Sequence, residues 1–488
     1  MINENILTKL TTIIGNGNIV SNKQAKSSYE VDWRGNFKGQ ALAVIKPQTT
    51  AQVQQIVKLC QELSIAIVPQ GGNTSLCGGA VPISACENPQ LILNLSRLNK
   101  ILEVDALNNS IMVEAGCTLA NVIAAASSHE RYFPLSIAAA DNCQIGGNIA
   151  TNAGGIHVIK YGMMRDLVLG VEVVLPNGEI TNQLTTLRKN NTNFDLKQLF
   201  IGSEGTLGII TKAVLKLYPK PKKYVTGLVG VADVEQAVAV LRQLQSKFSV
   251  CAFEIIHSSA QKIYNTYFPN IPLPISANWL ILFEFETNFI EESIDEVVSV
   301  ETIVLSKISF AQKLAEFEQG VLSNILSSLN INLDEAIIAD TSNKRDNLWQ
   351  IRENIPLAEK MHGYAIKHDI SLPINQIANF ILYNNANILK HYPHAQIIMF
   401  GHLGDGNLHY NVQLDNELNT KVNKAAINEL VYNDVIKYGG SISAEHGIGQ
   451  LKLDRYKTTS DPQSYLLSKQ IKQLIDPNNL FNPGKVFN

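Results

Sequence analysis

The stretch Gln144–Gly155, Gln-Ile-Gly-Gly-Asn-Ile-Ala-Thr-Asn-Ala-Gly-Gly, combines glycine with small polar side chains. Three more segments share this composition: Gln70–Gly79, Lys160–Arg165 and Gly202–Thr211. Glycine permits positive φ and close backbone approach, and successive N–H groups in such loops form anion-binding concavities. A pyrophosphate needs many donors in a small volume, and Gly with Ser, Thr and Asn supplies them without bulk. The four segments together therefore predict a site for a ligand that carries phosphate.

The two common nucleotide-binding motifs are absent or incomplete. No G-x-x-x-x-G-K-[ST] occurs, which excludes a P-loop. Gly15-Asn16-Gly17 begins a G-x-G pattern but lacks the third glycine and a convincing strand before it. A Rossmann site is therefore not predicted there. A tight turn remains the simple explanation of any one glycine segment, but it explains all four together poorly.

The composition sets the class of protein. A chain of 488 residues is expected to form two or three domains, and 45% hydrophobic with 17% charged residues is typical of a soluble globular protein. The net charge of -3 argues against nucleic acid or an anionic membrane as the main partner. No apolar run reaches about 18 residues, so no membrane span is predicted.

The N-terminus lacks a basic start followed by an apolar block, which predicts a cytoplasmic location. None of the six cysteines has C-x-x-C spacing, and we expect reduced, mostly buried thiols.

Hydrophobic periodicity predicts the secondary structure of the first half. Strands are expected at Ala41–Lys46, Ile65–Val68 and Val168–Leu175, and a hairpin at Ile101–Asp105 and Ser110–Glu114. Helices are expected from Thr49 or Thr50 onward and over Thr118–Ser127. The proline- and lysine-rich Tyr218–Lys223 predicts an exposed domain boundary.

Beyond that boundary the pattern predicts an α+β domain with a largely antiparallel sheet. The expected elements are Val225–Val231, Val234–Ser246, Trp279–Phe285, Phe310–Leu329 and Val422–Tyr438, the last ended by Gly439-Gly440. The tail Asp476–Lys485 is rich in Asn and Pro, so we expect it to pack across another segment without forming a helix.

A second informative stretch is Gly401–Asn411, Gly-His-Leu-Gly-Asp-Gly-Asn-Leu-His-Tyr-Asn. Asp-Gly between apolar residues is a strong hairpin signal, and a two-residue turn there would set His402 directly opposite His409. Facing side chains begin about 5 Å apart at Cβ, a separation that suits two imidazoles on one metal ion. Asn411 would point to the same face. Glu445-His446 adds a carboxylate and an imidazole, so a two-His, one-Glu set can leave a coordination position open.

These motifs resemble the FAD-dependent oxidoreductases of the vanillyl-alcohol oxidase / p-cresol methylhydroxylase type, in particular the D-2-hydroxyglutarate and D-lactate dehydrogenase branch. The resemblance runs from about residue 40 to the end and rests on five segments: Gln70–Thr74, Gly146–Gly155, Ile201–Gly208, His402–His409 and Glu445–Gly447. It implies an α+β fold with a two-subdomain FAD-binding domain, an antiparallel-sheet substrate domain and a C-terminal segment that returns to the FAD domain. The expected bounds are an N-terminal helical segment at 1–38, the FAD-binding domain at 39–220, the substrate domain with the metal hairpin at 221–430 and the C-terminal segment at 431–488.

The resemblance also implies which residues contact FAD. They are Pro69, Gln70, Gly71, Gly72, Asn73, Thr74 and Ser75 around the pyrophosphate, and Gly146, Gly147, Asn148, Thr151, Asn152, Gly154 and Gly155 along the dinucleotide and isoalloxazine. Glu204, Gly205, Gly208, Ile210 and Asn482 complete the set. Some relatives attach the flavin covalently to a histidine in the first loop. Asn73 occupies that place here, so we expect non-covalent FAD.

For the reaction, the resemblance implies oxidation of a D-2-hydroxy acid by hydride transfer to the flavin. Arg352 and Lys367 would bind the substrate carboxylate and Asn411 would hydrogen-bond the substrate. His402, His409 and Glu445 would bind Zn²⁺ or another divalent metal that polarises the substrate hydroxyl, and His446 would be the catalytic base. Relatives that act on hydroxyglutarate tend to carry a hydroxyl side chain four residues after the arginine, where this chain has Pro356, so a smaller acid such as D-lactate remains an alternative.

Other expectations stay open at this stage. The electron acceptor could be an electron-transfer flavoprotein, a quinone or a cytochrome, and an acceptor in the membrane would draw the protein to its surface. A homodimer is one option for the number of subunits. The competing functions are a zinc-dependent hydrolase that uses the same His-His-Glu set and a non-catalytic nucleotide-binding regulator.

Overall fold

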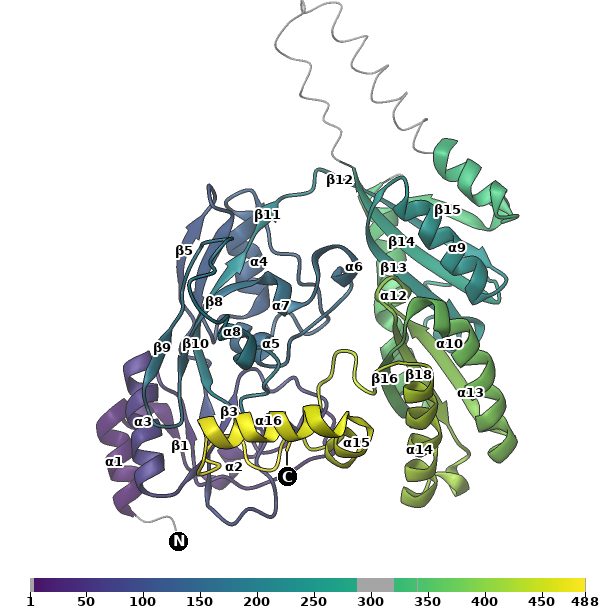
Figure 1. The fold of residues 1–488 in the computed structure, drawn as a ribbon. Coiled ribbons are helices and arrows are strands. Elements are labelled where there is room, and N and C mark those ends of the chain that lie inside the picture. The colour runs from purple at the N-terminus through teal and green to yellow at the C-terminus, as the bar shows by residue number, and fades with distance from the viewer. Residues whose placement is uncertain (1–3, 288–319, 340, 488) are drawn as a thin grey trace, which may run out of the picture. The chain divides into compact units, whose positions relative to one another are not determined.

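The computed structural model describes residues 4–287, 320–339 and 341–487. The chain divides into two compact units (Figure 1). Unit 1 combines Met1–Gly155, Tyr161–Lys220 and Glu445–Asn488, and unit 2 combines Ile156–Lys160 and Pro221–Ala444. Unit 1 is therefore built from both ends of the chain.

Unit 1 contains two main sheets. The first has the strand order β1 (Ile19–Val20), β2 (Val44–Ile45), β4 (Gln90–Asn94) and β3 (Ala66–Gln70), with β4 parallel to both β2 and β3. The second is antiparallel, in the order β5 (Ile101–Asp105), β6 (Ser110–Glu114), β10 (Ile209–Lys216), β8 (Val168–Val174) and β9 (Ile180–Asn182). A small ribbon pairs β7 (Arg131–Tyr132) with β11 (Tyr218–Pro219).

The helices of unit 1 follow the sequence signals closely. Thr49 caps α3 (Thr50–Glu62), and its apolar stripe Val53, Ile56 and Val57 is fully buried. Thr118 caps α4 (Leu119–Ser127) in the same way. The other helices are α1 (Glu4–Ile14), α2 (Lys23–Lys26), α5 (Ile145–Ala150), α7 (Met164–Leu167), α8 (Lys197–Phe200), α15 (Leu453–Thr459) and α16 (Pro462–Ile475), while α6 (Val158–Tyr161) lies where the chain passes between units.

The C-terminal tail returns to the first sheet without forming a helix, as expected. Phe481 forms an isolated parallel bridge with Ile67 of β3, and Asn482 N–H donates to the Ile67 carbonyl at 2.8 Å. Lys472 of α16 supports the turn, because its ammonium donates to the carbonyls of Phe481 (3.0 Å) and Thr206 (2.9 Å). The tail thus completes the sheet from which the first glycine-rich loop starts.

Unit 2 is built on one antiparallel sheet of seven strands. Its order is β15 (Ala336–Ala339), β12 (Lys223–Val231), β14 (Trp279–Thr287), β13 (Ser249–His257), β17 (Gln396–Gly401), β18 (Asn407–Gln413) and β16 (Ile366–Ser371). The α+β class with an antiparallel sheet in the second half of the chain is confirmed.

Each face of this sheet has its own helical layer. One apolar cluster joins the sheet to α9 (Val234–Gln245), α13 (Ile377–His391) and α14 (Lys421–Lys437). The other joins the opposite face to α10 (Ser258–Tyr267) and α12 (Ser342–His362). The face that packs against α12 also carries buried polar side chains, among them Glu254, Glu284 and Asn411, and it holds the candidate site.

Residues 310–319 of the expected helix Phe310–Leu329 lie outside the described residues, and residues 320–328 are helical. Among the described helices, none combines the length and the apolarity needed to cross a membrane. The six cysteines, all of which the structure describes, form no disulfide.

Candidate active site

The glycine-rich segments of unit 1 are hydrogen-bonded to one another. Gly202 N–H donates to the Ile149 carbonyl at 3.0 Å, and Glu204 N–H donates to the Ala150 carbonyl at 2.7 Å. The segment that begins at Gly202 therefore lies against α5, which belongs to the Gln144–Gly155 segment.

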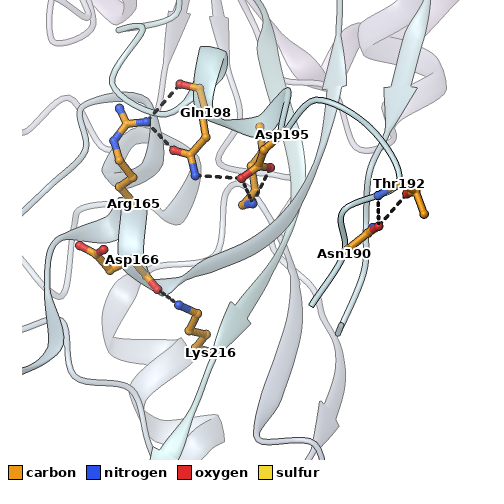
Figure 2. A network of polar contacts seen from close by, with 8 residues as sticks. Arg165, Asp166, Asn190, Thr192, Asp195, Gln198 and Lys216 are labelled. Atoms are coloured by element: carbon orange, nitrogen blue, oxygen red, sulfur yellow. Dashed lines mark hydrogen bonds and ion pairs between the residues drawn. The ribbon is translucent and has the colours of Figure 1, made fainter. Parts of the chain in front are cut away.

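Arg165, at the end of the Lys160–Arg165 segment, donates hydrogen bonds from its guanidinium to Gln198 of α8 (Figure 2). Its backbone N–H donates to Asn152 Oδ1 at 2.9 Å, while its guanidinium donates to the Ile201 carbonyl at 2.7 Å and to the Gln198 carbonyl at 3.2 Å. This arginine therefore holds the end of α8 in place directly before the loop that starts at Gly202.

The first loop, Pro69–Ser75, packs against the same group. A Cβ on Gly205 would lie 3.2 Å from Pro69 Cγ, and a Cβ on Gly72 would lie only 1.9 Å from the Asn142 carbonyl oxygen. Only glycine fits at residue 72 without moving the backbone directly before Gln144, and a Cβ on Gly71 would lie 3.4 Å from Gln144 Cβ. Three of the four segments thus meet at the end of β3.

The backbone of this loop has unused donors. None of the six successive N–H groups of residues 71–76 donates a hydrogen bond to another described residue. Buried or half-buried N–H groups normally find a partner, and a run of free ones forms an anion-binding concavity. Asn73, Gln144 and Asn482 each carry a buried side-chain oxygen without a partner in the described structure. The free N–H groups form a donor-rich cradle that fits the pyrophosphate of a dinucleotide, whereas the three oxygens are acceptors for hydroxyl or N–H groups of the same ligand.

The predicted cofactor residues do not all present side chains to this cradle. Ile210 is buried in the core of unit 1, and a Cβ on Gly208 would lie 2.4 Å from Val173 Cγ1. Gly208 therefore serves close packing between β10 and β8. Asn148 is also buried and its amide donates to Cys143 Sγ at 3.6 Å. The contacts of Ile210, Gly208 and Asn148 with FAD therefore remain predictions.

The Glu204 side chain holds the loop after His446. Its carboxylate accepts hydrogen bonds from Ile448 N–H (2.7 Å) and Gly449 N–H (2.8 Å), all within unit 1. Asn482 Nδ2 donates to the Glu204 carbonyl at 2.7 Å. Burial raises the pKa of Glu204, although the two N–H groups and the charge of Lys452 act to lower it.

The polar face of the unit 2 sheet collects the predicted substrate residues. In the register of β16 and β18, Lys367 lies opposite Asn411 and Asp369 lies opposite His409. Side chains two residues apart on a strand share a face, so all four belong to the same face. Asn411 is buried, and its Oδ1 accepts from the His368 backbone N–H at 3.2 Å.

The register expected for the histidine hairpin is wrong by two residues. His409 pairs with Phe400, and the connection from His402 to Gly406 is a longer loop that contains a 3-10 turn at Leu403–Asp405. The two-residue turn requires positive φ at both Asp405 and Gly406, but only Gly406 (φ 84°) has it. Because the shift is even, His409 keeps its face, and the two imidazole centroids lie 5.8 Å apart.

Glu254 of β13 connects His402 with Arg352. One carboxylate oxygen, Oε1, bonds to His402 Nδ1, and the other accepts from Arg352 Nε at 2.7 Å. Glu254 has no exposed side-chain surface. Burial acts to raise its pKa, but the charges and hydrogen bonds of Arg352 and His402 outweigh burial and hold the pKa at about 2. A carboxylate on Nδ1 sets the tautomer and the ring orientation that a histidine needs to bind a metal ion through Nε2.

The three predicted metal ligands come together. The ligand atoms of His402, His409 and Glu445 all lie within 4.8 Å of one another. Glu445 directly follows Ala444, whose N–H donates to the Asp369 carbonyl at 3.3 Å, so the chain itself tethers Glu445 to β16. Asp369, Glu445 and His446 form a second group of the same size. His409 Nδ1 lies 3.9 Å from Asp369 Oδ1, so each of the two imidazoles has a carboxylate near its Nδ1.

Arg352 and Lys367, the two residues predicted to bind the substrate carboxylate, differ in how many of their N–H donors are already hydrogen-bonded within the protein. Arg352 is buried and pairs with Glu254 through Nε, while its two terminal nitrogens have no hydrogen-bond partner among the described residues. Its guanidinium also lies 5.0 Å from the Phe400 ring centroid. Lys367 donates to Glu359 of α12 at 2.8 Å. Arg352 therefore has the better remaining geometry for a substrate carboxylate.

The sequence reasoning missed Glu254 and Asp369. Glu254 stands in the apolar run Ser249–His257, where a lone glutamate was a signal of a buried, paired charge. Asp369 lies two residues after Lys367, so its place on the same strand face could have been derived from the strand period.

Comparison with known protein families defines the class of protein to which the chain belongs. Residues 220–486 match the family of FAD linked oxidases, C-terminal domain, and residues 41–183 match an FAD binding domain. The chain belongs to the FAD-linked oxidase family, in agreement with the donor-rich cradle of unit 1.

Within this family, the chain is similar over most of its length to individual enzymes and to a solved structure. The chain is 34% identical over 478 residues to the mitochondrial D-2-hydroxyglutarate dehydrogenase of Arabidopsis thaliana, covering 97% of this chain and 80% of that protein. It is 32% identical to the D-2-hydroxyglutarate dehydrogenase of Stutzerimonas stutzeri, covering 99% and 98%. The crystal structure of p-cresol methylhydroxylase has the same fold, with a TM-score of 0.71 at 17% identity over 99% of this chain and 96% of that one. The expected fold type is confirmed.

Proposed function

We propose that this protein is an FAD- and metal-dependent dehydrogenase that oxidises a D-2-hydroxy acid to the 2-oxo acid. The observation that carries the proposal is the buried connection from Arg352 through Glu254 to His402. It joins a cation suited to a carboxylate with an imidazole suited to a metal, and a 2-hydroxy acid presents its carboxylate and hydroxyl on adjacent carbons. The names of the D-2-hydroxyglutarate dehydrogenase relatives support the same substrate class.

In this proposal Arg352 binds the substrate carboxylate through its two terminal nitrogens, which are the free prongs of a planar fork. Lys367 adds a second positive charge, partly neutralised by Glu359. Asn411 lies opposite Lys367 and offers its amide N–H₂ to the substrate, because its Oδ1 is already used by the His368 N–H.

His402, His409 and Glu445 would hold Zn²⁺ or another divalent ion, which fits two imidazole nitrogens and one carboxylate oxygen. A bound ion of this kind supplies Lewis-acid polarisation of a hydroxyl oxygen. His446 takes up the hydroxyl proton on a ring nitrogen.

The unit 1 loops would hold FAD, with the free N–H groups of residues 71–76 on its pyrophosphate. Bound FAD supplies the acceptor for the hydride from the α carbon. Asn73 replaces the histidine of covalently flavinylated relatives, and its amide donates to the Val31 carbonyl at 2.8 Å. Acid precipitation should therefore leave the flavin in the supernatant; yellow colour in the pellet would contradict this part of the proposal.

The proposal leaves D-2-hydroxyglutarate and D-lactate as the two candidate substrates. Pro356 lies in α12 one turn after Arg352 and cannot donate a hydrogen bond from its side chain. If hydroxyglutarate is the substrate, its second carboxylate is held by other groups. We also propose that the electron acceptor is an electron-transfer flavoprotein, a quinone or a cytochrome. The proposed location is cytoplasmic, with a peripheral membrane contact through the acceptor, and the proposed assembly is a homodimer. No observation favours a hydrolase or a non-catalytic regulator.

The decisive experiment is anaerobic stopped-flow reduction of the bound flavin with D and L enantiomers of both acids. Bleaching by a D acid only, lost after chelation and restored by zinc while flavin stays bound, is the expected result. Equal bleaching by both enantiomers, or full activity in metal-free protein, would refute it.

A further inference from the structure

Glu254 is the only acidic residue for which the described structure records contacts to both Arg352 and His402. Its two carboxylate oxygens are divided between them, one for each partner. No part of the Glu254 side chain is exposed, and the Arg352 side chain is 7% exposed. Both partners belong to the machinery of the proposed function, one on the substrate side and one on the metal side.

We propose that Glu254 is a positioning residue that fixes the metal ligand His402 and the substrate-binding Arg352 at the same time, and so couples metal affinity to substrate affinity. This inference rests on the proposed function. A carboxylate on Nδ1 sets the tautomer and the ring orientation of a metal-binding histidine. The same carboxylate on Arg352 Nε fixes the guanidinium through one nitrogen, and its two terminal nitrogens have no hydrogen-bond partner among the described residues.

The coupling depends on both oxygens being acceptors. Glutamine at residue 254 offers one acceptor oxygen and one donor group, so its N–H₂ must face either the Nδ1–H of His402 or the Nε–H of Arg352. One of the two contacts is then lost and replaced by two opposed donors. Aspartate keeps two acceptor oxygens on a shorter side chain and should preserve part of the function.

Phe400 strengthens the connection by packing. The Arg352 guanidinium lies 5.0 Å from the Phe400 ring centroid, and the His409 ring centroid lies 4.9 Å from it. Since β17 carries Phe400 beside both groups, a change in the direction of Arg352 also disturbs the second imidazole ligand.

The same sheet face provides a matched control. Glu284 of β14 is also without exposed surface, and it pairs with Arg345 of the same helix α12 at 2.6 and 2.9 Å. It accepts a further hydrogen bond from Trp349 Nε1 at 2.9 Å. Arg345 and Arg352 are seven residues, or about two turns, apart on one face of α12. Glu284 thus matches Glu254 in burial and partner type, but it contacts none of the proposed ligands or substrate residues.

The test uses full-length, flavin-loaded protein with Glu254→Gln, Glu254→Asp and Glu284→Gln. Zinc affinity is measured by competition with a chromophoric chelator, flavin content by absorbance, and KM and kcat with the better D acid. For Glu254→Gln we expect zinc affinity to fall about 10–100-fold and KM to rise, with flavin content unchanged. Glu254→Asp should lie between Glu254→Gln and wild type. Glu284→Gln should lower the Tm but leave zinc affinity and KM as they are.

Wild-type zinc affinity and KM in Glu254→Gln would overturn the inference, and so would equal losses in Glu284→Gln. If Glu254→Gln does not fold, Glu254→Asp decides the matter, because an unaltered zinc affinity and KM there would also overturn it. A different result would refute the proposed function itself. In that case the wild-type protein would bind no zinc at the site, and flavin reduction by the substrate would be as fast in His402→Ala as in wild type.

Discussion

The Glu204 carboxylate offers a sharp test, because two explanations of this residue differ in outcome. The family resemblance implies that Glu204 contacts FAD, whereas the structure has its side chain accepting the N–H groups of Ile448 and Gly449 at 2.7 and 2.8 Å. These two residues follow Glu445 and His446 closely. Glu204 should therefore order the loop that carries a metal ligand and the base.

The expected magnitude follows from the hydrogen bonds. A hydrogen bond to a charged group contributes about 1.5–3 kcal/mol. Glu204→Gln keeps one acceptor oxygen and loses about one bond, and Glu204→Ala loses both. Since about 1.4 kcal/mol is a factor of ten, zinc affinity should fall about tenfold or more in Glu204→Gln and about 10²-fold or more in Glu204→Ala.

The assay is chelator competition for zinc, run beside flavin absorbance on the same samples. The matched control is Glu172→Gln, which changes a buried carboxylate of unit 1 that is bonded to Thr211 and Lys212 and not to the loop. Zinc affinity should be wild type in the control. Loss of flavin with normal zinc affinity in Glu204→Gln would refute our reasoning and support the direct FAD contact.

Three further predictions concern catalysis, substrate choice and acid stability. His446→Ala should retain flavin and zinc but slow flavin reduction at least about 10²-fold, since positioned proton transfer is worth about 10²–10⁴-fold; near-normal stopped-flow rates would remove His446 from the mechanism. Pro356→Thr restores a backbone donor to the Arg352 carbonyl and adds a hydroxyl beside Arg352, so KM for D-2-hydroxyglutarate should fall relative to D-lactate, and an unchanged ratio of the two KM values would contradict it. The pKa of Glu172 lies below its ordinary value of 4.5, because hydrogen bonds from Thr50, Thr211 and Lys212 outweigh burial. Its stabilising contribution is therefore present at neutral pH and lost as the pH falls below about 4.5, so denaturant titrations should show a smaller acid-induced loss of stability in Glu172→Gln than in wild type.

Local signals in the sequence were sufficient for most elements of the fold. Capping threonines and the helical stripe located α3 and α4, and the hairpin of β5 and β6 has the expected bounds. These elements depend on neighbours in the chain. The strand Ser249–His257 was not anticipated, because a continuous apolar run is ambiguous between a buried strand and a buried helix.

In the candidate site, too, features set by neighbouring residues could be predicted from the sequence, whereas contacts between distant residues could not. Two imidazoles on one sheet face followed from the spacing of His402 and His409, but their register did not, because turn geometry depends on the φ of Asp405 within the folded loop. The pairing of Glu254 with both Arg352 and His402 joins residues up to 148 positions apart. Such a contact follows from the strand order of the sheet, which no local pattern specifies.

Unit 1 is discontinuous, and this has a consequence for biogenesis. A ribosome makes the whole of residues 221–444 before it reaches the segment from Glu445 onward that belongs to unit 1. Until Phe481 and Asn482 emerge, the outer edge of β3 lacks its last neighbour and the loop after β3 lacks its support. Unit 1 therefore stays incomplete while nearly half of the chain is translated. We expect the cofactor to be loaded only after translation has ended.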